Sequence, residues 1–524
     1  MLAHKGMNRR NMIKGAAASS IAAGFATNSW ATILAQDETG AVGGGTLTHA
    51  TALEMTNIDP NVNSGSMHIS TLWLEGLVSI AEDGRVIPFL AESWDISEDG
   101  LTYSFQIREG ITFHNGETLT ADDVVFSIER TMNPDLGAPR RASLLDGETV
   151  TVVDPMTVQL TLSQPFGPLL PSLAELWIVP RASANLDGTI SDPIGTGPFR
   201  FLSWTPNDET VTERFENYWQ KGLPYLDAVR VKVITDDTTR MAALRSGEVD
   251  LMQGFPATLL ETISDGGYAT APILDPSTWT LLFNLNTTPA PIDDIRVRRA
   301  IGYAVNKAEL MASRIGDAPF GEVSNMPSSS GEFWYLPDVE DAFPQQDLEM
   351  TASLLAEAGF ADGMPDLVFP ATVEVQKHAE VLAGQLAAAG IPTSLEIIDR
   401  TAYRERYERF DWHIILNVTG PRTDPSAKYA TYYSGAAAEG LANPNLLAVD
   451  DLYLEAIRIT DPEARRAVWG QLWQIMQTEE VAAISLWHDS NVYAYKESLQ
   501  NFRPGRTFYL HSLEGGLSRS WLKE

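Results

Sequence analysis

Paired carboxylates are the side chains of this 524-residue sequence that could most directly perform acid–base chemistry. They occur at Asp122–Asp123, Asp236–Asp237 and Asp293–Asp294. In a hydrolase, one member of such a pair donates a proton while the other accepts one. Each pair here stands where an apolar helical pattern begins, and carboxylates at that position stabilise the positive end of the helix dipole. We therefore expect helix caps, and we keep a secreted hydrolase that uses an acid pair as the alternative function.

Motifs for other kinds of catalysis are missing from the sequence. It contains no G-x-S-x-G nucleophile motif, no H-E-x-x-H metal helix and no G-x-x-x-x-G-K phosphate loop. Its eight His are scattered, and it has no Cys to form a disulfide or a zinc site. Gly195-Thr196-Gly197 resembles a phosphate loop, but Pro198 removes a backbone donor and no helical pattern follows, so we expect a tight turn. We expect no catalytic residue, no metal and no cofactor.

The composition describes an acidic, globular protein. The sequence has 37 Lys+Arg against 69 Asp+Glu, a net charge of −32, which repels nucleic acids and anionic lipids, so we expect no nucleic-acid partner. Hydrophobic residues make up 44% of the chain, enough for a packed interior. The length exceeds what one ordinary core of about 100–200 residues accommodates, and therefore predicts two or three cores.

The N-terminus has the pattern of an export signal. Arg9–Arg10 precede the apolar run Gly15–Ala26, and no acid occurs before Asp37. This pattern predicts that residues 1–36 are a twin-arginine-type signal peptide, cut after Ala31 or Ala35; a buried N-terminal helix is the alternative. Cleavage would remove four basic residues and no acid, which changes the net charge from −32 to −36. We expect the mature chain to be exported and soluble, without a lipid anchor because it has no Cys.

Strands and helices alternate along the mature chain. The expected strands include Thr46–Leu53 and Leu101–Ile107, and the expected helices begin after Thr120 and span Asp236–Ser246 and Gln376–Ala389. Asn57–Pro60 is expected to form a turn, and a further helix is expected to carry Leu72, Trp73 and Leu77. This alternation predicts a mixed α/β fold.

Several short segments in fixed order suggest a family. They include Leu90–Trp94, Ser97–Phe105, Phe113–Gly116, Ala121–Ser127, Gly195–Phe199, Asp236–Arg240, Gly247–Asp250 and Asp294–Ala300. As a set they resemble the signature of solute-binding proteins family 5, the periplasmic dipeptide-, oligopeptide- and nickel-binding components of ABC importers. The resemblance covers essentially the whole mature chain.

The resemblance implies an α/β periplasmic binding protein of type II, with two lobes and the ligand in the cleft between them. The implied boundaries are 45–282 for lobe I, with an inserted subdomain at about 78–190, 283–489 for lobe II, and 490–524 for the C-terminal return to lobe I. Chain crossings near Asn284 and Asn491 would form the hinge. The implied partners are ABC permease subunits and a peptide or other small ligand, bound by a periplasmic monomer.

The resemblance also implies where the ligand lies, and one position departs from the family pattern. Peptide-binding relatives hold the ligand amine with an aspartate in a segment that matches Asn417–Pro425, and Pro421 stands in place of that acid. Arg422 adds a guanidinium that suits a carboxylate or phosphate, unless it is exposed or paired within the protein. The expected solute is therefore a peptide or other small polar organic molecule, anionic ones included; a sugar or metal-complex binder on the same fold is a further alternative.

The other implied contacts come from the facing loop and the hinge. For His68 and the two tryptophans a place in the core is an equal or stronger alternative, and Asp424 could only cap the next turn. The candidate ligand-binding residues are Asn63, Ser64, Ser66, His68, Trp279, Asn284, Thr419, Gly420, Arg422, Asp424, Trp487 and His488.

Overall fold

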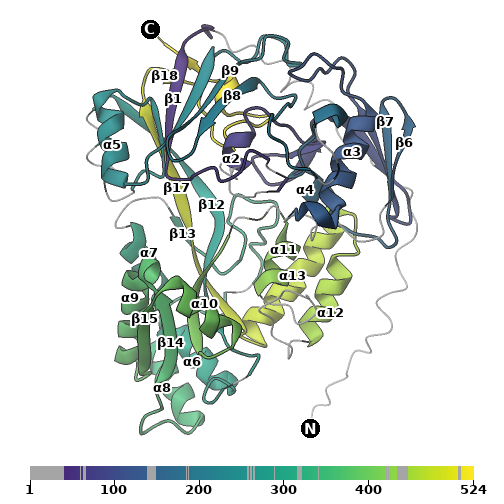
Figure 1. The fold of residues 1–524 in the computed structure, drawn as a ribbon. Helices are drawn as coiled ribbons and strands as arrows, with labels where there is room; N and C mark the ends of the chain where they lie inside the picture. Colours follow the sequence, from purple (N-terminus) through teal and green to yellow (C-terminus); the bar gives the residue numbers. More distant parts are fainter. Residues whose placement is uncertain are drawn as a thin grey trace. The chain divides into compact units, whose positions relative to one another are not determined.

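The largest sheet has nine strands among the described residues, and its strands β12 and β17 run through the middle of the view in Figure 1. The computed structural model describes residues 40–59, 61–62, 67–138, 149–183, 186, 188–256, 259, 263, 266–287, 289–315, 321–339, 341–420, 422, 424–432, 447–505 and 509–523. The predicted signal peptide at 1–36 lies outside this part of the chain, as do Asn63, Ser64 and Ser66.

The strand order of this sheet is β16-β12-β17-β11-β1-β10-β9-β8, and β13 also pairs with β17. Its strands are β1 (Thr46–Thr51), β8 (Phe199–Thr205), β9 (Glu209–Arg214), β10 (Ala228–Val233), β11 (Leu251–Gln253), β12 (Tyr268–Phe283), β13 (Gly321–Val323), β16 (Ile414–Thr419) and β17 (Ala483–Lys496). β1 pairs in parallel with β10 on one side and β11 on the other, so these three strands end at the same edge.

The helix α5 (Asp237–Ser246) connects β10 to β11 and follows the sequence prediction closely. Asp236 caps its first turn, with the carboxylate accepting a hydrogen bond of 2.7 Å from the Thr239 N–H. Gly247 ends it at φ 82°, a left-handed conformation that glycine adopts without strain. The local rules for starting and ending helices therefore placed this element correctly.

Two long strands, β12 and β17, run antiparallel through the middle of the fold (Figure 1). Their ladder extends from Tyr268 opposite Lys496 to Leu282 opposite Ala483, with an irregularity in register between Leu274 and Thr278. On one side of the irregularity β17 pairs with β11, and on the other side β12 pairs with β16. The two strands thus connect two halves of the molecule.

Separate apolar cores occupy these halves. We call lobe I the half whose core includes Leu47, Val229 and Leu251, and lobe II the half whose core includes Ile301 and Trp469. Lobe II contains the parallel pair β14 (Leu367–Thr372) and β15 (Thr393–Ile398). Its helices are α6 (Ile295–Ala304), α7 (Lys307–Ile315), α8 (Leu348–Glu357), α9 (Gln376–Ala388), α10 (Arg400–Glu408), α11 (Pro425–Tyr432), α12 (Leu447–Ala456) and α13 (Pro462–Thr478).

A third core belongs to a four-stranded sheet in the order β4-β5-β7-β6, and we call this part the subdomain. Its elements are β4 (Ala91–Ile96), β5 (Thr102–Ile107), α3 (Ala121–Met132), β6 (Thr149–Asp154), β7 (Thr157–Thr161) and α4 (Leu169–Leu173), with the hairpin β2 (Val78–Ile80) and β3 (Val86–Pro88) beside them. In β5, Tyr103, Phe105 and Ile107 are buried and the residues between them are half-buried, as the alternating pattern predicts. The mixed α/β class is confirmed.

The expected helix carrying Leu72, Trp73 and Leu77 was wrong. The helix α2 covers only Met67–Ser70, and Leu77 lies just before β2. The carbonyls of Leu72 and Trp73 accept from the N–H groups of Phe199 (2.9 Å) and Gly197 (3.2 Å), so they are not free to extend a helix. This packing requires glycine, because a Cβ on Gly195 would lie 1.9 Å from the Trp73 carbonyl oxygen. A long-range contact thus overrides the local helical pattern.

None of the described helices is long and apolar enough to cross a membrane.

Candidate functional site

The end of β16 and the segment that follows it contain four of the predicted ligand contacts, Thr419, Gly420, Arg422 and Asp424. Thr419 is buried, and its hydroxyl donates a hydrogen bond of 3.2 Å to the carbonyl of Thr278 on β12. Asp424 is also buried. Its carboxylate accepts a hydrogen bond of 2.7 Å from Arg465 Nη2 on α13 and one of 2.9 Å from the Ser426 N–H. The interpretation of Asp424 as a cap for the next turn therefore holds, and its second oxygen belongs to an internal ion pair.

Among the predicted contacts that the structure describes, Arg422 is the exposed one. Its guanidinium lies back toward its own segment, since a Cβ on Gly420 would sit 3.9 Å from Nη1. A desolvated, bidentate contact with an anion requires a buried fork, and the structure shows this side chain exposed. Recognition of an anionic solute by Arg422 stays a prediction.

Trp279 and Trp487 lie directly opposite each other on β12 and β17. Their rings stack at 4.8 Å with an interplanar angle of 10°, and both are buried in the lobe II core. Both indole N–H groups donate to Asp489, at 2.9 Å to Oδ2 and 2.8 Å to Oδ1. In this structure each indole thus covers the face of the other, and Asp489 fixes the pair.

His488 and Asn284, the other two predicted contacts near the crossing, bond to the backbone of lobe II. The His488 ring nitrogens lie 2.8 Å from the Ser277 carbonyl and 3.1 Å from the Met326 carbonyl. Asn284 Nδ2 lies 2.8 Å from the carbonyls of Phe410 and of Trp412. Asn284 follows the last residue of β12, beyond the register irregularity at Leu274–Thr278. A hinge near Asn284 and Asn491 stays a prediction.

His68 lies in lobe I, away from those residues in the chain but buried like them. Its carbonyl accepts 3.2 Å from the Leu510 N–H. Its ring is close enough to His49 to affect that residue: burial lowers the pKa of His49 to about 3, and the charge of His68 adds to this lowering.

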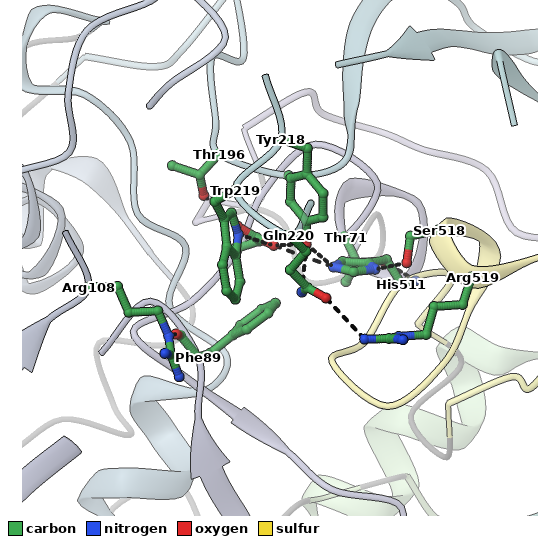
Figure 2. A network of polar contacts seen from close by, with 12 residues as sticks. Thr71, Phe89, Arg108, Thr196, Tyr218, Trp219, Gln220, His511, Ser518 and Arg519 are labelled. Carbon is green, nitrogen blue, oxygen red and sulfur yellow. Dashed lines mark hydrogen bonds and ion pairs between the residues drawn. The ribbon is translucent and has the colours of Figure 1, made fainter. Parts of the chain in front are cut away.

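Sequence reasoning missed a buried polar network around Glu75, and Figure 2 labels several of its members, among them Thr196, Tyr218 and Trp219. The Glu75 carboxylate accepts from Thr196 Oγ1 (2.8 Å), Tyr218 OH (2.7 Å) and Trp219 Nε1 (3.0 Å). Burial raises the pKa of Tyr218, and Glu75 raises it further. Because its members come from distant parts of the sequence, no local pattern indicates the network. Its carboxylate is fully engaged, which favours a structural role in lobe I.

Lobe II touches the subdomain at two backbone hydrogen bonds. Gly167 N–H donates 2.7 Å to the Ile457 carbonyl, and Phe333 N–H donates 2.7 Å to the Asp83 carbonyl. A Cβ on Gly167 would lie 2.1 Å from the Ile459 carbonyl oxygen. Glycine at 167 therefore permits this close contact between the subdomain and lobe II.

The paired acids that suggested acid–base chemistry cap helices, as expected. Asp123 accepts 3.0 Å from the Thr120 N–H at the start of α3, and Asp294 accepts 2.8 Å from the Arg296 N–H at the start of α6. In the part of the chain that the structure describes, no three acidic or histidine side chains are grouped so that they could hold a metal ion.

Comparison with known proteins gives consistent matches. Residues 85–440 match the family described as bacterial extracellular solute-binding proteins, family 5. The glutathione-binding protein GsiB of Pectobacterium atrosepticum is 30% identical over 355 residues, which cover 66% of this chain and 67% of that protein.

Solved structures match over nearly the whole chain. The ABC transporter substrate-binding protein CtaP of Listeria monocytogenes superposes with a TM-score of 0.81 at 22% identity, covering 92% of this chain and 100% of that one. AgaA from A. tumefaciens R10, solved in complex with agropinic acid, superposes with a TM-score of 0.73 at 27% identity, covering 92% and 99%.

Proposed function

Since the chain belongs to family 5 of the bacterial extracellular solute-binding proteins, with the two-lobe α/β fold of periplasmic binding proteins, we propose that it captures a small polar organic solute for an ABC importer. The solute is a peptide or a molecule of similar size and polarity, and the chain delivers it to permease subunits in the membrane. Relatives that bind glutathione and agropinic acid support this solute class, because both names denote small polar organic molecules.

The crossing of β12 and β17 carries this proposal. A hinge needs a few residues that absorb a change in backbone angles while the elements on either side stay rigid. The register irregularity at Leu274–Thr278, opposite Ser490 and His488 and followed by a second shift at Trp279–Thr280, supports such a place between the two ladders. We propose that the two lobes close about it, with lobe I at 45–282 (subdomain at about 78–190), lobe II at 283–489 and the return to lobe I at 490–524, except that residues 279–282, which pack in the lobe II core, move with lobe II.

Binding without turnover fits the acids of the described chain better than hydrolysis does. The carboxylates first considered as a general acid and base accept hydrogen bonds from helix N-termini. A hydrolase would instead need two carboxylates facing one another across a substrate. We propose that the chain acts as a binding protein and releases its solute unchanged.

We further propose that residues 1–36 direct the chain to the periplasm by the twin-arginine route, and that the mature protein acts there as a soluble monomer without a lipid anchor. Arg9–Arg10 and the run Gly15–Ala26 support this proposal. Replacing both arginines with lysine should leave the precursor in the cytoplasm, as fractionation would show. Unchanged export of that variant contradicts the twin-arginine route.

Small-angle scattering tests the proposed function. A thermal-shift screen over peptides, opine-like acids, oligosaccharides and nickel chelates first selects a solute, since ligand at about 100 times Kd stabilises a protein by about 2.7 kcal/mol. Adding that solute should reduce the radius of gyration, and mass spectrometry should recover the solute intact. A product whose formation stops in the variant Asp236→Asn/Asp237→Asn would favour the hydrolase instead.

A further inference from the structure

Glu54 places a carboxylate in the interior of the structure without a partner. Both oxygens are buried, and neither makes a hydrogen bond within the part of the chain that the structure describes. The residue as a whole is only half-buried, so its stem reaches the surface while its charged end points inward. This is the reverse of the usual arrangement for a glutamate, whose carboxylate is almost never buried unless it is paired.

Such an arrangement is costly in a folded protein. A buried polar group without a hydrogen bond loses its hydration and gains nothing in return, and the loss is larger for a charged group. Arg240, a cation of lobe I near the carboxyl ends of β10 and β11, pairs with Asp237 and donates to the carbonyls of Ile234 and Thr235, and its Nε is buried without a hydrogen bond. The described residues therefore supply no hydrogen-bond donor to the Glu54 carboxylate.

The position of Glu54 suggests that a ligand supplies the missing hydrogen-bond donors. It follows the carboxyl end of β1, at the edge where the parallel strands β10 and β11 also end. Ligands of open α/β sheets bind outside this edge. Glu54 thus lies where the fold type places ligands.

A second acceptor lies at the same edge. Asn491 belongs to β17, just beyond the residue Tyr493 that pairs with Gln253 at the end of β11. Its Oδ1 is buried and makes no hydrogen bond to any described residue. Asn491 also pairs with Ile273, next to the register irregularity between the lobes. Two side chains thus carry unpaired acceptor oxygens beyond the carboxyl ends of β1 and β11, and Asn491 also lies next to the proposed hinge.

We propose that Glu54, assisted by Asn491, forms a subsite for a cationic nitrogen group of the solute, an ammonium or a guanidinium. This inference rests on the proposed function and names the charge of the solute. Carboxylate and amide oxygens accept hydrogen bonds only, so the complementary group is one that carries several N–H donors. A bound divalent metal is a poorer fit, since Ca²⁺ takes 6–8 oxygen ligands and the subsite offers a carboxylate and one amide oxygen.

A pair of tripeptides that differ in one charge tests the subsite. Ala-Arg-Ala and Ala-citrulline-Ala have nearly the same shape, but only the first carries a guanidinium. In calorimetric titrations of the mature chain, Ala-Arg-Ala should bind about tenfold or more tightly, as expected for hydrogen bonds to a charged group. Glu54→Gln should reduce this preference to within about twofold and leave the affinity for the citrulline peptide unchanged.

Glu98→Gln is the matched control, because Glu98 is exposed on the subdomain and the substitution removes the same charge. It should keep the full preference for the arginine peptide. Equal affinity of the wild type for the two peptides, or no detectable binding of the cationic one, overturns the subsite. Compaction of the protein by the citrulline peptide or by another solute of the screen would still support the proposed function, so the two failures can be told apart.

A measurement without ligand tests the same assignment. If the Glu54 carboxylate binds a solute and has no structural role, its unpaired charge destabilises the unliganded protein. Glu54→Gln should then unfold at the same temperature as the wild type or higher. A fall in Tm of more than about 3 °C would show that the carboxylate stabilises the fold itself, and would overturn the proposal.

Discussion

Asp424 and Arg465 form a buried ion pair, with 2.7 Å between Oδ2 and Nη2. The pair joins the segment after β16 to the helix α13, and the Arg465 guanidinium also lies 4.7 Å above the ring of Trp334. Two further nitrogens of Arg465, Nε and Nη1, are buried without a hydrogen bond. Asp424 is therefore the acceptor that compensates the desolvated charge of Arg465. This interaction gives Asp424 a structural role that needs no solute.

The first prediction follows from this dependence. Asp424→Ala should lower the free energy of unfolding by about 3–5 kcal/mol, because it leaves a buried guanidinium unpaired. The double variant Asp424→Ala/Arg465→Met should recover part of this loss, since it removes the unpaired charge as well. Urea unfolding of the three proteins measures both effects. A normal stability of Asp424→Ala combined with a loss of solute affinity would return Asp424 to the binding site.

The second prediction concerns the contact between the subdomain and lobe II. Gly167→Ala should weaken binding of the selected solute, because the added Cβ would meet the Ile459 carbonyl at 2.1 Å and hold the lobes apart. Titration calorimetry measures the affinity, and scattering should show a smaller compaction on adding solute. Gly384→Ala is the control: no atom lies within 4 Å of a Cβ there, so it should bind like the wild type. Unaltered affinity of Gly167→Ala would mean that this contact is not part of the closed state.

What the sequence could predict was local. The alternation in β5 and the caps of α3 and α5 were predictable because the residues that decide them lie within one element. The resemblance to a family correctly implied the two-lobe fold. The paired stacking of Trp279 and Trp487 could not be predicted, because the residues that meet, such as Trp279 and Asp489, are 210 positions apart.

The candidate site was predicted less well, for the same physical reason. Whether a polar side chain is free for a ligand depends on which distant groups engage it. Asp424 and His488 both turn out to bond within the protein. Glu54 could not be predicted as a site residue, because a single glutamate after a strand matches no motif. Only the fold shows that its carboxylate is buried without a partner among the described residues.

The third prediction tests the anionic-solute hypothesis. Because Arg422 is exposed, Arg422→Ala should cost less than about 1 kcal/mol of solute binding, and high salt should remove most of that loss. Titrations of the wild type and the variant at low and high salt measure the difference. A loss of about 2–5 kcal/mol that persists in high salt would instead indicate that closure buries the guanidinium against an anionic group.

The last prediction concerns pH and His114, which holds the turn of residues 194–199 in place. The Gly195 N–H donates 3.3 Å to His114 Nδ1, so the ring proton is on Nε2, 3.0 Å from the Gly197 carbonyl. A second proton on Nδ1 would remove the first of these hydrogen bonds. Burial lowers the pKa of His114 to about 4, whereas an unfolded histidine titrates near 6.5.

Between these two values the unfolded chain binds more protons than the folded one, so the contribution of His114 to stability is complete above about pH 6.5 and is lost as the pH falls toward 4. By pH 5 the loss should reach about 1–2 kcal/mol. Urea unfolding at pH 7 and pH 5 should show a smaller decrease for His114→Gln, which keeps an N–H donor toward Gly197 but cannot titrate. The variant is less stable than the wild type at pH 7, and the gap narrows at pH 5. Equal decreases in the two proteins would mean that other groups cause the acid sensitivity.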